Sequence, residues 1–109
     1  MIYDLKTYTA TNGNYDALLA RFSEKTLPIF NRLGINVIHC WESNDIPNTF
    51  YYLTQYDDVS AYKASWDAFA KDSEWLQIKG DSEKIAGGPL LASQSTLTLH
   101  SLPFSPAQQ

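Results

Sequence analysis

The sequence predicts an α+β fold in which a four-stranded antiparallel sheet carries helices on one face. Three observations support this fold. The residue patterns follow the order strand, helix, strand, strand, helix, strand. A short turn-rich segment, 44–48, links the two middle strand patterns, which favours an antiparallel hairpin. The chain has 109 residues, of which 44% are hydrophobic, so it fits one domain with a substantial core.

The first strand and the first helix are predicted from the N-terminal third of the chain. Ile2–Thr9 alternates its side chains and is rich in β-branched and aromatic residues, which is typical of a strand. After the turn residues 12–14, apolar side chains recur every three or four residues as far as Phe30. This spacing predicts a helix that ends before Gly34. Pro28 lies within the pattern, and we expect it to disturb the helix.

The middle of the chain predicts a hairpin of two strands. Asn36–Ser43 and Thr49–Tyr56 are both rich in β-branched and aromatic residues. The segment between them is built from Asn, Asp, Ile and Pro, which suits a turn.

A second helical region and a last strand complete the pattern. Asp57 or Asp58 suits a helix N-cap, and the apolar stripe that follows is interrupted at Asp72–Ser73. The helical region ends at residues 87–89, Gly-Gly-Pro, and Leu90–His100 alternates as a strand. This order of elements is that of a ferredoxin-like domain. We assign residues 1–102 to a single domain and residues 103–109 to a short polar C-terminal tail.

The alternation along each strand predicts which side chains share a face of the sheet. We expect the helices to cover Tyr3, Leu5, Ile38, Cys40, Leu97 and Leu99. The opposite face would then hold Ile2, Asp4, Lys6, Tyr8, Val37, His39, Trp41, Gln94, Thr96, Thr98 and His100. Both sides of Thr49–Tyr56 carry aromatic residues, so the pattern leaves the orientation of this strand open. Because two helices cover only one face, the other face is expected to meet water or another chain.

Charge and composition exclude several classes of function. The net charge of −4 is the wrong sign for binding to phosphate backbones, so we expect no nucleic-acid partner. No apolar run is long enough to cross a membrane, and the first residues include Asp4 and Lys6 rather than an apolar leader. A single cysteine, Cys40, excludes an internal disulfide. Together these features predict a cytoplasmic protein.

No metal site and no cofactor are expected, and haem ligation by His39 is the alternative that the sequence leaves open. His39 and His100 lie far apart in the sequence, and no Cys-x-x-Cys or His-x-x-x-His spacing is present. The pair Gly87-Gly88 precedes a strand rather than a helix, so it does not form a phosphate-binding loop.

Asp4, Lys6 and Tyr8 form the first candidate site. They alternate along one strand and so share a face, where they could place a base, a cation and a hydroxyl around a small ligand. The alternative is a structural ion pair between Asp4 and Lys6.

His39 and Trp41 form a second candidate site. An imidazole beside an aromatic wall could act as a general base, with Tyr52 or Tyr51 across the hairpin as a hydrogen-bond donor. The alternative is a hydrogen-bonded structural histidine.

Trp66, Phe69 and Trp75 have the spacing of a core stripe, which favours packing over ligand contact. Trp75 lies beyond the interruption at Asp72–Ser73 and is the one most suited to the mouth of a pocket.

Several segments of the chain resemble the NIPSNAP family. They are IYDLKTYT (2–9), TLPIF (26–30) before Gly34, the strand that contains Trp41, and above all YDDVSAYKASWDAFAKDSEW (56–75). The resemblance covers nearly the whole chain up to the fourth strand, whereas the tail 103–109 matches no feature of the family. It implies that two sheets pair to form a homodimeric α/β barrel.

The resemblance does not define a reaction, because the molecular activity of the family is undefined. We therefore consider two hypotheses. In the first, the protein binds a small molecule in a pocket of the barrel. In the second, it is a cofactor-independent monooxygenase or isomerase that acts on an aromatic or polyketide-like substrate. His39 and Asp4 would then be catalytic, and Lys6, Tyr8, Trp41, Tyr52 and Trp75 would contact the ligand.

Overall fold

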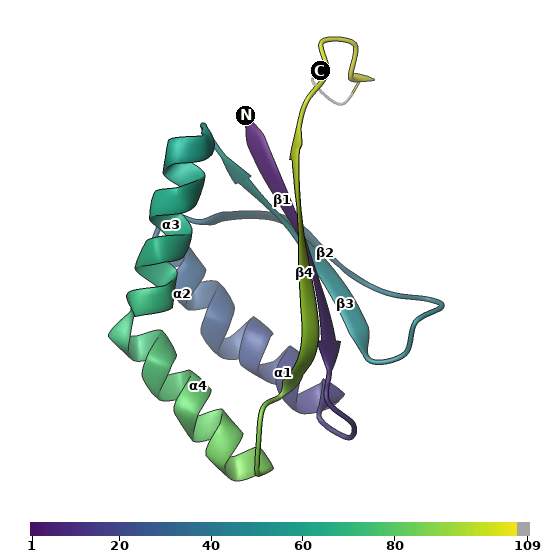
Figure 1. Ribbon diagram of the computed structural model, residues 1–109, viewed down its shortest axis with the longest axis vertical. Coiled ribbons are helices and arrows are strands. Elements are labelled where there is room, and N and C mark those ends of the chain that lie inside the picture. Colours follow the sequence, from purple (N-terminus) through teal and green to yellow (C-terminus); the bar gives the residue numbers. More distant parts are fainter. Residues whose placement is uncertain (107–109) are drawn as a thin grey trace.

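The computed structural model describes residues 1–106 and has the predicted order of elements (Figure 1). The elements are β1 (Ile2–Ala10), α1 (Tyr15–Arg21), the π-helix η1 (Phe22–Thr26), α2 (Leu27–Arg32), β2 (Asn36–Glu42), β3 (Thr49–Tyr56), α3 (Val59–Lys71), α4 (Ser73–Ala86) and β4 (Leu91–His100). The strands form one antiparallel sheet in the order β2-β3-β1-β4. This confirms the predicted ferredoxin-like fold.

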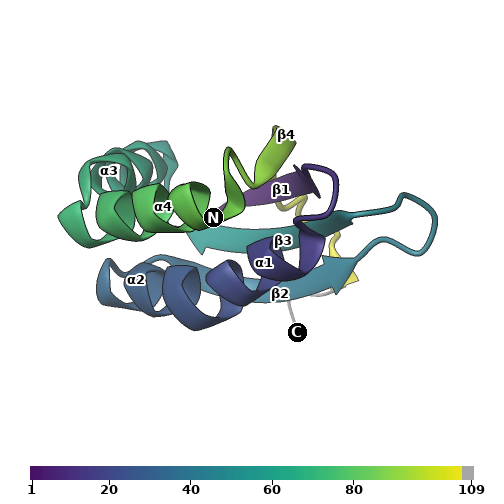
Figure 2. The same ribbon diagram turned by 90° about the horizontal axis from the view of Figure 1, so that it is seen from below.

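The helices leave one face of the sheet uncovered. They lie together on one side of the strands (Figure 1). Seen from below, they form two rows, α3 with α4 and α1 with α2 (Figure 2). Between these rows and the sheet lies the core, whose most deeply buried apolar side chains are Tyr52, Phe30, Leu18, Ile29 and Leu90. None of the helices among residues 1–106 is both long and apolar enough to cross a bilayer.

The assignment of faces was wrong for β1 and β4. Asp4 and Lys6 are buried under the helices, whereas Leu97 and Leu99 are 56% and 43% exposed on the uncovered face. Tyr3 pairs with Leu99 and Leu5 with Leu97, so these side chains lie on the uncovered face too. Within β1 and β4, the alternation correctly grouped the residues that share a face. The error was to assume that the helices cover the more apolar of the two groups. An ion pair between Asp4 and Lys6 allows the more polar group to be buried instead.

A β-bulge in β2 explains the remaining errors of placement. Val37 lies opposite Thr54 and His39 opposite Leu53, which leaves Ile38 as an extra residue. The bulge reverses the alternation, so Val37 packs against the core while His39 and Trp41 lie on the uncovered face. Ile38, predicted to meet the helices, lines a hollow on the uncovered face.

Cys40 was predicted to be buried and is exposed. It lies opposite Tyr52, whose side chain is fully buried beneath the helices. The Cys40 side chain therefore points to the face of the sheet on which the helices lie, as predicted. Because β2 is an edge strand, however, the helices leave the Cys40 side chain uncovered.

The structure determines the orientation of β3, which the sequence left open. Phe50, Tyr52, Thr54 and Tyr56 are buried beneath the helices. The alternate residues Tyr51, Leu53 and Gln55 are half-buried on the other side. Both sides of this strand are therefore rich in aromatic or apolar groups, although the helices cover only one of them.

We define the open face as the uncovered side of the sheet with the side chains Tyr3, Leu5, Ile38, Trp41, Tyr51, Leu53, Leu97 and Leu99. Ile38 and Trp41 are each 45% exposed there. An apolar surface that spans all four strands is unusual for a monomeric protein and is typical of an interaction site.

The disturbance predicted at Pro28 takes the form of a π-helix. The segment η1 precedes Pro28, which stands at the start of α2. Proline has no backbone N–H and clashes with a regular helical turn before it, so a wider turn relieves the conflict. Aspartates begin the later helices as expected. Asp58 accepts from the backbone N–H of Ala61 at 2.8 Å, and Asp72 from that of Trp75 at 2.9 Å.

One glycine inside α4 and one at its end allow the helix and its C-terminal cap to be tested by substitution. Gly87 has a φ of +83° and ends the helix, whereas Gly80 lies inside it, and an added Cβ would meet no atom within 4 Å at either site. Gly87→Ala is therefore expected to destabilise the protein by about 1 kcal/mol through backbone strain alone. Gly80→Ala is expected to stabilise it by about 0.8 kcal/mol. Urea denaturation would measure both, and effects of the same sign would contradict this account of the helix end.

Candidate functional site

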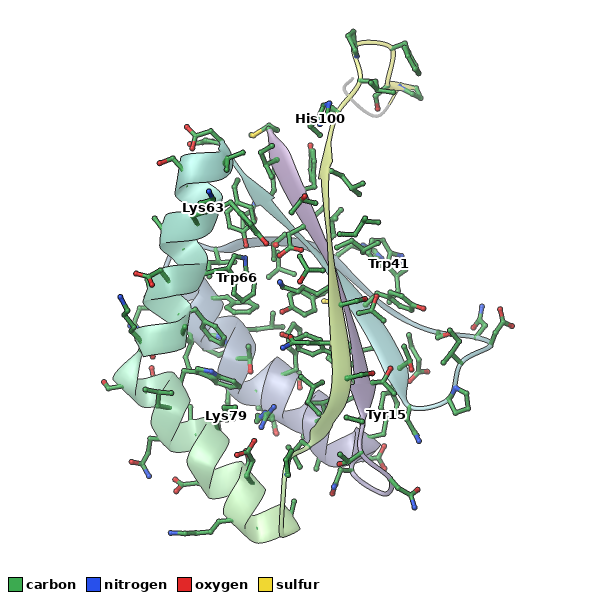
Figure 3. The ribbon with its side chains drawn as sticks, viewed as in Figure 1. Tyr15, Trp41, Lys63, Trp66, Lys79 and His100 are labelled. Carbon is green, nitrogen blue, oxygen red and sulfur yellow. The ribbon has the colours of Figure 1, made fainter. Side chains whose placement is uncertain are left out.

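A pocket of about 370 Å³ lies between the sheet and the helices α1, η1, α3 and α4. Trp66 projects from α3 and Lys79 from α4 into the space between the helices and the strands (Figure 3). The aromatic side chains in the wall are Tyr8, Phe22, Tyr62, Trp66, Phe69 and Trp75, and the charged ones are Lys6, Arg21, Lys79 and Glu83. An apolar pocket with a few polar groups is typical of a site for a small organic molecule.

β1 supplies the charged floor of this pocket. Its pleat turns Asp4, Lys6 and Tyr8 to the same side, towards the helices. Asp4 is completely buried, and its Oδ2 lies 3.1 Å from Nζ of Lys6. The Lys6 ammonium also donates a hydrogen bond of 2.6 Å to Oγ1 of Thr96 and lies 4.4 Å from the centre of the Trp66 ring. Three different elements therefore fix the position of the ammonium.

The carboxylate of Asp4 is poorly solvated. Neither of its oxygens accepts a hydrogen bond of ordinary geometry from residues 1–106. Burial raises the pKa of Asp4, and the charge of Lys6 and the nearby Tyr62 hydroxyl oppose this rise only in part. Asp4 is therefore a carboxyl group whose proton affinity is increased beside a pocket.

Two tyrosines form a buried hydroxyl pair behind the pocket. The hydroxyl oxygens of Tyr8 and Tyr52 are 2.7 Å apart, so one hydroxyl donates to the other. Burial raises the pKa of Tyr8 and raises that of Tyr52 well above its usual range. Both hydroxyls are therefore neutral at pH 7. Tyr8 lines the pocket, whereas Tyr52 holds the Tyr8 hydroxyl in place.

Arg21 is the pocket residue that the sequence analysis missed. It is only 9% exposed, its Nη1 donates to Oγ of Ser82 at 3.0 Å, and its guanidinium lies 5.1 Å from the centre of the Trp75 ring. Burial lowers its pKa, while the charge of Glu83 opposes that effect. A signal was present, because Arg21 interrupts an apolar helical stripe between Leu18 and Phe22, both of which are buried.

Trp75 stands at the pocket, and its ring is fixed from two sides. The Phe69 ring stacks on it with a centroid distance of 4.8 Å, and Arg21 lies on it as described above. Asp72, which caps α4, orients this end of the helix and accepts hydrogen bonds of 2.8 Å from Arg32. Arg32 and the Trp75 N–H lower the pKa of Asp72, which is thus charged at neutral pH.

The structure separates the candidate residues into two groups. Lys6, Tyr8 and Trp75 line the pocket, and Asp4 and Tyr52 lie directly behind two of them. His39 and Trp41 lie on the open face instead, with their ring centres 4.6 Å apart. Figure 3 shows Trp41 and Trp66 on opposite sides of the sheet. The sheet thus separates His39 from Asp4 and from the pocket.

Metal binding has no visible basis among residues 1–106, where no three His, Cys, Asp or Glu side chains come together in a way that could hold an ion. Although the Cys40 side chain is exposed, neighbouring protein atoms partly desolvate its thiol and raise the thiol pKa, which disfavours the reactive thiolate.

Comparison with known proteins identifies the family. The NIPSNAP family model matches residues 3–106. The match includes the first part of the C-terminal tail predicted at residues 103–109. Residues 107–109 lie outside the described part of the chain. No curated protein sequence is significantly similar to the chain.

Solved structures show the same fold. A crystal structure of an uncharacterized NIPSNAP domain protein from Burkholderia xenovorans has 23% identity and a TM-score of 0.80, with 97% of this chain and 99% of that chain covered. A NIPSNAP family protein from Agrobacterium tumefaciens has 18% identity and a TM-score of 0.81, with 96% of each chain covered. An antibiotic biosynthesis monooxygenase is more distant, with 9% identity, a TM-score of 0.65, and 94% of this chain and 100% of that chain covered. The match over almost its whole length shows that this chain belongs to the NIPSNAP family.

Proposed function

We propose that the protein binds a small organic molecule in the pocket between the sheet and the helices, and that it acts as a homodimer paired through the open face. The pocket itself is the main support for binding. Its volume of about 370 Å³ suits a small ligand, and its aromatic wall surrounds a few fixed polar groups.

The exposed apolar side chains of the open face support the homodimer. They extend over all four strands, and a second copy of the same sheet would cover them with a matching surface. The pocket lies on the other side of the sheet, so dimerisation would leave its mouth accessible.

Tryptophan fluorescence can test binding in the pocket. Two of the three tryptophans, Trp66 and Trp75, line the pocket, whereas Trp41 lies on the open face. In a Trp41→Phe variant, a ligand that enters the pocket is expected to change the remaining emission and to raise the melting temperature. Native mass spectrometry of protein purified from its host would identify a retained ligand.

A pair of alanines on α3 provides the control. Ala70 lines the pocket, whereas Ala68 is exposed elsewhere on the same helix. Ala70→Phe is expected to reduce binding by obstructing the pocket, and Ala68→Phe to leave it unchanged. Equal effects of the two variants, or a protein that is empty after purification and binds no compound in a diverse library, would overturn the proposal.

A second candidate function is catalysis as a cofactor-independent monooxygenase or isomerase. The observation that favours it is the Asp4–Lys6 pair, because Lys6 lines the pocket and its ammonium, 3.1 Å from Oδ2 of Asp4, could pass a substrate proton to the buried Asp4 carboxylate. Asp4→Asn would then leave binding of the identified ligand nearly intact and abolish its conversion. Unchanged conversion would exclude Asp4 as the base.

A further inference from the structure

The charges around the pocket do not balance. Asp4 is paired with Lys6 at 3.1 Å, and Glu83 is paired with Lys79 at 3.1 Å. Arg21 has no carboxylate within 4.0 Å among residues 1–106. The pocket therefore has one uncompensated positive charge, although the whole chain carries a net charge of −4.

Arg21 also has unused hydrogen-bonding capacity. A guanidinium has five N–H donors, which are arranged to bind a carboxylate with two parallel hydrogen bonds. The side-chain partner of Arg21 among the described residues is Ser82, a neutral hydroxyl that uses Nη1. Arg21 is nine-tenths buried and lines the pocket, and none of its nitrogens is a buried atom without a partner, so its remaining donors can be reached by water or by a ligand in the pocket. A ligand carboxylate could replace water at these donors and neutralise the guanidinium charge.

The guanidinium is held ready for such a ligand. Ser82 accepts a hydrogen bond from one end of it, and the Cζ of Arg21 lies 5.1 Å from the centre of the Trp75 ring. Trp75 is in turn stacked on Phe69 with an angle of 27° between the rings. Little side-chain freedom is then lost on binding, which favours affinity.

The remaining wall restricts the rest of the ligand. Six aromatic side chains line the cavity, and the Lys6 ammonium is already occupied by Asp4, Thr96 and the Trp66 ring. One free cation matches one negative charge, whereas a phosphate dianion would leave a second charge without a partner in an aromatic site. A flat aromatic or conjugated body would pack against the walls by stacked and edge-to-face contacts.

From these observations we infer that the ligand is an aromatic or conjugated monocarboxylate whose carboxylate is bound by the Arg21 guanidinium. This inference rests on the proposed binding function and specifies the ligand class. Arg21 acts as the anchor of the carboxylate, and the aromatic walls enclose the body.

Two probes of nearly equal shape test the charge requirement in the unaltered protein. They are 2-naphthoate and its neutral analogue 2-naphthamide, titrated at pH 7 by calorimetry. We expect the carboxylate to bind at least about tenfold more tightly, because charge-assisted, bidentate hydrogen bonds are stronger than neutral ones. Equal affinities would overturn the inference while leaving the proposed binding function in place. If neither naphthyl probe binds but other compounds do, the inference also fails, and if no compound binds, the proposed function fails with it.

Variants of Arg21 test the identity of the anchor. Arg21→Met is expected to make the two probes bind equally, and Arg21→Lys to retain only part of the preference, because it keeps the charge and loses the planar donor pair. Lys71→Met is the control, since Lys71 is exposed, is paired with Asp67 and does not line the pocket, so the preference should persist. A preference that survives in Arg21→Met would overturn the assignment. If Arg21→Met does not fold, Arg21→Lys and the comparison of probes in the unaltered protein decide the question.

Discussion

Replacing Lys6 by methionine is expected to lower the free energy of unfolding by about 3 kcal/mol at pH 7, because it leaves a buried carboxylate without its partner. Asp4 is fully buried, and the Lys6 ammonium is its ion-pair partner at 3.1 Å. Methionine retains most of the length and the apolar stem of lysine, so the pocket wall is largely preserved. Urea denaturation at a fixed protein concentration would measure the loss.

The effect of Lys6→Met should depend on pH with a defined sign. In the folded protein the pKa of Asp4 is raised above its ordinary value of 3.8. A raised pKa means that the folded state binds the proton more strongly, so stability increases as the pH falls through the folded pKa towards 3.8. Removal of Lys6 raises the pKa of Asp4 further. As the pH falls, the difference in the free energy of unfolding between Lys6→Met and the wild type should therefore shrink by up to about 1.4 kcal/mol per pH unit.

The double variant Asp4→Asn/Lys6→Met is the control, because it removes both charges and keeps the volume at residue 4. It is expected to be more stable than Lys6→Met at pH 7, since no buried charge is left. The charge of Asp4 would not be the cause if Lys6→Met loses the same free energy of unfolding at pH 7 and at pH 4.5. The same conclusion would follow if the added Asp4→Asn substitution does not reduce this loss.

The second large effect is expected at the open face, where Leu97→Glu should convert the proposed dimer into a monomer. The substitution puts a carboxylate into an apolar surface, and two-fold symmetry places it there twice. We expect the dissociation constant to rise by at least about 100-fold, which corresponds to a loss of about 2.7 kcal/mol. Because Leu97 is 56% exposed in the single chain, the fold itself should persist. Sedimentation velocity at micromolar concentration would measure the change, and circular dichroism would verify the fold.

Ile85→Glu on α4 is the matched control for this experiment. Ile85 is 89% exposed and lies on the helical side of the molecule, away from the open face. The Ile85→Glu substitution introduces the same charge at an exposed apolar residue and should leave the dimer intact. A wild-type protein that is monomeric at micromolar concentration would disprove pairing through the open face, as would a Leu97→Glu variant that remains a dimer.

The order of the elements could be predicted because it depends on local patterns. The interruption at Asp72–Ser73 was visible as a potential cap, and Asp72 does accept from the Trp75 N–H. Pro28 indicated a disturbed helix, although the pattern did not show that the disturbance would be a π-helix. Each of these features depends on residues within one or two helical turns, and such local signals can be read directly from the chain.

The candidate site could be predicted only in part. Asp4, Lys6 and Tyr8 were grouped correctly because a strand places alternate residues on one side. His39 was grouped with them in error, because one extra residue, Ile38, reverses the alternation in β2. Arg21 was missed because its importance depends on Trp75 and Ser82, which are more than fifty positions away in the sequence.

The sequence by itself determined the elements of this protein, its family and the sets of residues that share a face of each regular strand. Only the tertiary structure decided which of these sets the helices cover. Alternation is symmetric with respect to the two sides of a sheet, so it cannot distinguish a buried Asp4–Lys6 pair from an exposed one. The helices pack over the set that contains the ion pair and the aromatic residues of β3, and this choice creates the pocket on one side and the apolar open face on the other.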